Sequence, residues 1–100
     1  MYRKINERFF DGRLPTVSVR YSDDLIEEHA DGIYTLDGEI LIASYLRVSY
    51  GLTQIVLIHE MVHVELGDAY RGYPGDGGHG MRFQARLVEL FNAGVYDNLL

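Results

Sequence analysis

The sequence predicts an α+β fold, in which a small sheet of about three strands packs against two or three helices. Three patterns support this class. Residues 53–66 are predicted to form a helix, because residues 52–58 are apolar on almost every helical face and Val62, Val64 and Leu66 continue the pattern, as expected for a helix that is buried in a core. Two short apolar runs flank the dipeptide Asp37-Gly38, which is a strong signal for a β-hairpin. Residues 16–21 alternate apolar and polar side chains, as a half-buried strand does.

The N-terminal segment is expected to contribute one helix and that alternating strand. The helix spans about residues 2–10, with Ile5 and Phe9 directed inward. The dipeptide at positions 11–12 contains glycine and ends the helix. A polar and acidic stretch over residues 22–31 then forms a surface connection.

The hairpin is expected to pair residues 33–36 with residues 39–42 across a two-residue turn. This register places Leu36 opposite Glu39. Residues 44–51 then form a connection with room for one helical turn.

Two further boundaries complete the predicted elements. Thr53 is the expected N-cap of the central helix, and Gly67 is its expected stop. Residues 68–78 are rich in glycine and predict a loop. The last helix is expected over residues 80–91. Its apolar stripe consists of Phe83, Leu87, Leu90 and Phe91.

The central helix contains an HExxH motif, His59-Glu60-Met61-Val62-His63. The two imidazoles leave the helix about 40° apart on one face, so they can share one zinc ion. The carboxylate of Glu60 can then reach a water molecule on that ion, which is the signature of a zinc peptidase with Glu60 as general base. The plainer interpretation is a solvated polar stripe on a core helix. Burying these three side chains without partners would cost several kcal/mol, so either a polar cleft or a metal must compensate.

A catalytic zinc site keeps one position for water, so His59 and His63 need a third protein ligand. The sequence leaves two candidates open. His79 stands among glycines just before the last helix, and Glu89 lies within that helix. His79 is favoured, because a ligand at the start of the next helix is a workable geometry, although it can also be an ordinary loop histidine.

Three segments beside the HExxH motif give the chain a family resemblance. Residues 79–83, HGMRF, resemble the HGxxF element that follows HExxH in SprT-like metallopeptidases. Residues 6–15, NERFFDGRLP, resemble that family's N-x-x-[FY]-F-x-x-x-L-P element. Residues 38–43, GEILIA, resemble its strand before the active-site helix. The similarity spans about residues 5–91.

This resemblance implies a minimal zincin-like domain with peptidase activity. It implies one zinc ion per chain, held by His59, His63 and His79, with Glu60 as the base. It also raises His79 well above Glu89 as the third ligand.

The rest of the family pattern and the composition set the expected organisation. Phe83 of the HGxxF element is expected to be a packing residue. The 100 residues have the length of one domain, and no Cys is present for the zinc ribbon that many family members carry. We therefore expect one SprT-like core domain over residues 1–100, without a ribbon.

The charge and hydropathy of the chain narrow the expected partners. A net charge of −6 disfavours general binding to nucleic acid without excluding it. The peptidase interpretation instead gives a protein or peptide substrate as the expected partner. No apolar run approaches membrane-spanning length, and the N-terminus lacks an apolar segment of signal-peptide length. We therefore expect no membrane contact and a cytoplasmic location.

Three further expectations concern the mechanism. The peptide substrate is expected to lie along residues 39–43 as an added strand, since this segment directly precedes the active-site helix. Tyr70 and Tyr73 are candidate donors to an oxyanion, with simple packing as the alternative. The tail over residues 95–100 either packs on the core or covers the cleft.

Two other functions remain open at the level of the sequence. One is a peptidase that cleaves a single regulatory partner, as ImmA/IrrE-like HExxH proteins do. The other is a zinc-containing module that binds peptides without cleaving them. An intact Glu60 argues against the second.

Overall fold

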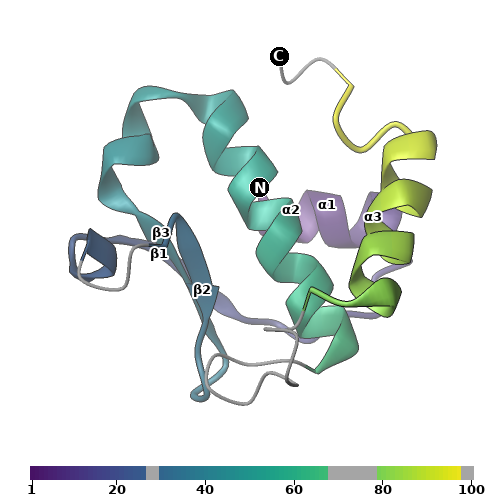
Figure 1. Cartoon of the computed structure of the whole chain (residues 1–100), viewed down its shortest axis with the longest axis horizontal. Coiled ribbons are helices and arrows are strands. Elements are labelled where there is room, and N and C mark those ends of the chain that lie inside the picture. Colours follow the sequence, from purple (N-terminus) through teal and green to yellow (C-terminus); the bar gives the residue numbers. More distant parts are fainter. Residues whose placement is uncertain (27–29, 68–78, 98–100) are drawn as a thin grey trace.

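The computed structural model describes residues 1–26, 30–67 and 79–97. A mixed three-stranded sheet lies on one side of the long central helix α2, and α1 and α3 lie on its other side (Figure 1). The predicted α+β class and the number of strands are confirmed. The elements are α1 (Tyr2–Phe9), β1 (Ser18–Ser22), η1 (Asp24–Ile26), β2 (Gly32–Tyr34), β3 (Glu39–Ala43), η2 (Ser44–Val48), α2 (Tyr50–Leu66) and α3 (Met81–Asn92).

The central helix begins one turn earlier than predicted. Ser49, rather than Thr53, is the N-cap, and its hydroxyl accepts a hydrogen bond from the backbone N–H of Leu52. Thr53 lies inside the first turn, where it is buried and its hydroxyl donates to the carbonyl of Leu46 at 2.8 Å. Gly67 ends the helix as predicted, with a left-handed φ of 76° that glycine adopts without strain.

The predicted hairpin register is wrong by one residue. Thr35, not Leu36, lies opposite Glu39, and its backbone N–H donates to the Glu39 carbonyl at 2.7 Å. The backbone N–H of Gly38 donates back to Thr35 at 3.0 Å, and Gly38 has a φ of +81°. These features describe a three-residue loop that ends in a left-handed residue. The Asp-Gly signal located the turn correctly but did not distinguish a two-residue loop from this longer one.

Strand β3 is the central strand of the sheet. It pairs in parallel with β1 and antiparallel with β2, so both of its edges are already hydrogen-bonded. The expectation that a substrate adds to residues 39–43 is therefore wrong. The edges left for a further strand, among the elements that the structure describes, belong to β1 and β2.

The N-terminal motif, residues 6–15, stabilises the turn that follows α1. The buried amide of Asn6 donates to the carbonyl of Leu14 and accepts from its backbone N–H, both at 3.1 Å. This double contact fixes the turn after α1. It directs Phe10, which is fully buried, into the core, whereas Phe9 is only partly buried. The expectation that Ile5 faces inward is confirmed.

Helix α3 packs on the other side of α2, and its buried apolar face is narrower than the stripe predicted from the sequence. Phe83 and Leu90 are buried, but Phe91 is 65% exposed and belongs to the outer surface. The chain then turns back, and Val95 is buried with its N–H bonded to the carbonyl of Leu90. None of the helices in the described part of the chain is long and apolar enough to span a membrane.

Candidate metal centre

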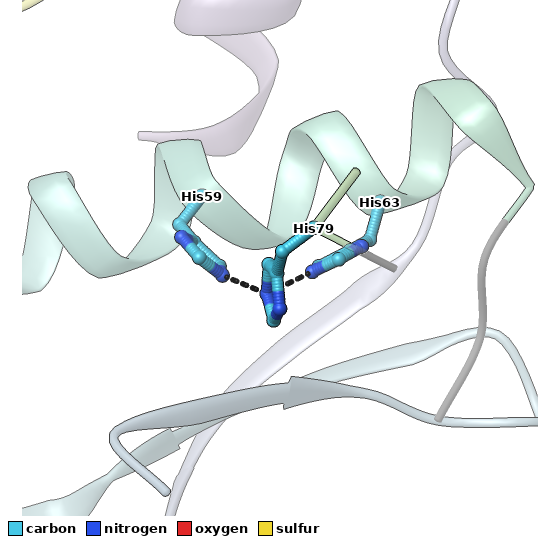
Figure 2. Close-up of side chains that lie close together, drawn as sticks. All are labelled: His59, His63 and His79. Carbon is cyan, nitrogen blue, oxygen red and sulfur yellow. Dashed lines mark hydrogen bonds between the residues drawn. The ribbon is translucent and has the colours of Figure 1, made fainter. Parts of the chain in front are cut away.

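Three imidazoles from two elements converge on one point (Figure 2). His59 and His63 project from successive turns of α2, and His79 reaches them from the segment directly before α3. The Nε2 atom of His79 lies 3.0 Å from Nε2 of His59 and 3.2 Å from Nε2 of His63. The ligand atoms of the three side chains all lie within 4.8 Å of one another, so the cluster can hold a metal ion.

These separations fit a zinc ion. Zinc–nitrogen bonds of about 2.0–2.1 Å in a tetrahedron place two ligand nitrogens about 3.3 Å apart. The observed Nε2 separations of 3.0 and 3.2 Å are close to this value. Moreover, one Nε2–H group cannot form good hydrogen bonds with two other ring nitrogens at once. A cation shared by the three nitrogens explains the arrangement better.

The protonation states of the two helical ligands suit a metal ion. Burial, together with the neighbouring charge of His79, lowers the pKa of His59 to about 4. Burial and the charges of His59 and His79 lower the pKa of His63 to about 3. Both imidazoles are therefore neutral near pH 7, which is the form that binds metal ions.

The carboxyl group of Glu60 lies beside the cluster, away from water. Its side chain is nearly fully buried, and Oε2 lies 3.9 Å from Nε2 of His59. Oε1 has no hydrogen-bond partner within the part of the chain that the structure describes. Burial raises the pKa of Glu60 to about 8. A divalent cation at the neighbouring imidazoles would favour the ionised carboxylate, so Glu60 also fits a metal site.

The ring of Phe83 packs against all three imidazoles. Its ring stacks on His63 with centroids 4.6 Å apart, and it contacts the rings of His59 and His79 edge-on at 4.8 and 4.9 Å. Phe83 is only 1% exposed. The expectation that it is a packing residue is therefore confirmed, and the surface that it packs against is the histidine cluster itself.

The histidine cluster opens into a cleft of about 390 Å³ between α2 and the start of β2. Its lining consists of residues 30–32, of Ile55 and Val56 on α2, and of the site residues His59, Glu60 and His79. A larger cavity of about 460 Å³ lies between the N-terminus of α1 and β1 and shares no lining residue with this cleft. The chemistry of the side chains, not the cavity size, identifies the candidate site.

The sequence model of the SprT-like family matches residues 1–97. The chain belongs to the SprT-like family. No curated protein and no solved structure gives a significant match. In this SprT-like chain, the HExxH motif and the histidine of residues 79–83 meet in space.

The other predicted site residues have different outcomes. Glu89 lies outside the histidine cluster, and its carboxylate instead accepts from Nη1 of Arg86 at 3.1 Å. Tyr70 and Tyr73 lie outside the described residues. Within the described tail, Val95 lines a cavity with Ile5 and Ile58, on α1 and the first half of α2, and not the cleft.

Two features beside the site were missed by the sequence analysis. The first is Gly32, where a Cβ atom would lie 2.6 Å from Cγ1 of Val56 and 3.3 Å from Cγ of Glu60. A glycine at a strand end is a general sign of close backbone approach. The second is an ion pair between Glu65 and Arg86, which no short-range pattern indicates because 21 positions separate the two residues.

Proposed function

We propose that this SprT-like chain is a zinc-dependent endopeptidase that acts on protein or peptide substrates. One observation carries the proposal: three imidazoles converge beside a buried carboxylate, and this carboxylate lines an open cleft together with His59 and His79. His59, His63 and His79 would hold the ion. Bound zinc would supply a Lewis acid for the substrate carbonyl and would lower the pKa of water.

Glu60 would move the proton during hydrolysis. Its carboxylate accepts a proton from the attacking water and delivers it to the nitrogen of the departing amine. Burial raises the pKa of Glu60 in the metal-free protein, whereas bound zinc would favour the ionised carboxylate that the first step requires. The Glu60 carboxylate lies beside the ligand cluster, with Oε2 3.9 Å from Nε2 of His59.

The outer edge of β2 is the proposed binding site for the substrate backbone. Asp31 and Thr35 direct their peptide groups toward β3, since the Asp31 carbonyl accepts from Ala43 and the Thr35 N–H donates to Glu39. In an antiparallel ladder the alternate residues face the opposite way, which leaves Gly32 and Tyr34 directed outward. A peptide that adds to this edge would run along the cleft, where Gly32 lies against Glu60.

Replacing Glu60 with Gln tests the proposed role directly. The variant keeps the shape of the side chain but cannot accept the proton, so we expect turnover of an unfolded protein such as casein to fall by about 10²-fold or more. Zinc content, measured by elemental analysis, should stay at one ion per chain. Substantial residual proteolysis by the zinc-loaded variant would rule out Glu60 as the base.

The wild-type protein provides the other outcomes of this test. A zinc-loaded protein that binds an unfolded chain without cleaving it would indicate a peptide-binding module. Cleavage confined to a single partner would indicate a regulator peptidase. Absence of zinc after reconstitution would remove the peptidase proposal.

A further inference from the structure

The histidine cluster is divided between two elements. His59 and His63 are fixed relative to each other by the backbone of α2, whereas His79 comes from the segment that leads into α3. Gly80, the N-cap of α3, offers no side-chain cap. The position of the third imidazole therefore depends on how α3 lies on α2.

Two residues of α3 hold it against the site. Phe83 stacks on the imidazoles, but an apolar ring contact alone permits sliding. Arg86 lies one turn further along the same helix face, and its Nε and Nη2 donate to the two carboxylate oxygens of Glu65 at 2.6 and 3.2 Å. Nη2 of Arg86 also donates to the carbonyl of Phe9 at 3.2 Å. In the described part of the chain, every hydrogen bond from an α3 side chain to another helix comes from Arg86.

The Arg86–Glu65 pair lies close to the ligands and is shielded from water. Glu65 follows His63 by two residues on α2, and the side chains of Arg86 and Glu65 are only 19% and 14% exposed. Glu65 accepts a further hydrogen bond from Arg13 at 3.2 Å, and the guanidinium of Arg86 lies over the ring of Phe10. The pair therefore joins α1, α2 and α3 at the end of the molecule that carries the histidine cluster.

We propose that Arg86 and Glu65 are the positioning pair of the metal centre. By fixing how α3 lies on α2, they hold His79 where its Nε2 meets those of His59 and His63. This inference rests on the proposed zinc site. The planar fork of arginine binds both carboxylate oxygens at once, which restrains rotation as well as distance, and a single lysine ammonium cannot do this.

Replacing Arg86 with Lys tests the positioning role while the positive charge is kept. We expect zinc affinity, measured by competition with a chromogenic chelator, to weaken about tenfold or more. The same change in a His79→Ala background should leave the residual zinc affinity unaltered, because the pair acts only through His79. The matched control is Arg3→Lys, at the exposed Arg3–Glu7 pair with side chains 88% and 61% exposed, which should leave zinc affinity unchanged.

Cobalt substitution gives an independent measurement. The visible absorption of bound Co²⁺ reports the number and geometry of its ligands, so Arg86→Lys should shift the wild-type spectrum toward that of His79→Ala. Glu65→Gln serves as the second variant if Arg86→Lys does not give a folded metal-free protein by circular dichroism. It should change zinc affinity in the same direction.

The possible results separate this inference from the proposed function. If the wild type binds no zinc, the proposed function fails and the inference fails with it. If the wild type binds zinc and Arg86→Lys binds it equally well, only the positioning role is overturned. An equal loss in the presence and absence of His79 would also overturn it, since the pair would then act through other residues.

Discussion

The two halves of the candidate metal centre are built in different ways. His59, Glu60 and His63 lie on one helix, and their relative positions follow from its periodicity alone. His79 approaches from a separate element, and its position depends on contacts that Phe83 and Arg86 make with distant parts of the chain. One half is therefore determined by local geometry, and the other by tertiary packing.

The largest effects should come from removing a ligand in each half. We expect His63→Ala and His79→Ala both to lose stoichiometric zinc, measured by elemental analysis after dialysis. His63→Ala should bind more weakly than His79→Ala, because the latter keeps two ligands that α2 already holds in place. Equal residual affinities in the two variants would mean that the helical pair has no such advantage.

The next effect concerns Glu60, whose burial raises its pKa to about 8. In the metal-free protein, the folded state keeps this proton up to about pH 8, whereas the unfolded chain releases it near the ordinary value of 4.5. Between these values the folded state binds more protons, so this contribution to stability falls as the pH rises, by at most about 1.4 kcal/mol per pH unit.

The comparison of wild type with Glu60→Gln isolates this contribution. Urea unfolding of the two metal-free proteins should show the variant gaining relative stability from pH 5 to pH 8. The lowered pKa values of His59 and His63 make both proteins less stable as the pH falls below about 6.5, so their effect cancels in the difference. A difference that does not change with pH would show that Glu60 is not buried in this way.

A smaller effect is expected at the contact between the sheet and the helical half. Gly32→Ala places a methyl group 2.6 Å from Cγ1 of Val56. The neighbouring atoms must shift to make room, which should destabilise the protein by about 1–3 kcal/mol. Turnover should also fall, because the methyl group would lie 3.3 Å from Cγ of Glu60. Urea unfolding and peptidase assays measure the two effects.

Two variants sharpen this prediction. Adding Val56→Ala should restore part of the stability, because the atom in closest contact is then removed. Gly38→Ala, at the hairpin tip with a φ of +81° and open space around it, should reduce stability without a specific effect on turnover. If Gly32→Ala and Gly38→Ala affect turnover equally, the close approach of β2 has no role in the site.

The same division explains how much could be predicted from the sequence. The buried helix, its Gly67 stop and the facing pair His59 and His63 follow from periodicity and turn chemistry, which are local. The hairpin was located but its register was not, because an Asp-Gly dipeptide fits both two- and three-residue loops. The central place of β3 depends on its parallel pairing with β1, which no local pattern encodes.

Predicting that His79 lies close to His59 and His63 required more than the spacing of the residues along the chain. The residues themselves left Glu89 open, and the resemblance of residues 79–83 to HGxxF favoured His79. The Arg86–Glu65 contact and the close approach of Gly32 to α2 were missed entirely. Both depend on surfaces that meet only after the chain has folded.

The central place of β3 also has a consequence for the order of folding. Its pairing with β2 closes a loop of three residues, whereas its pairing with β1 joins Ser18 to Glu39, which are 21 positions apart. Short-range pairings form before long-range ones because they lose less chain entropy on closure. The hairpin and α2 should therefore assemble first, and the N-terminal strand should complete the sheet last.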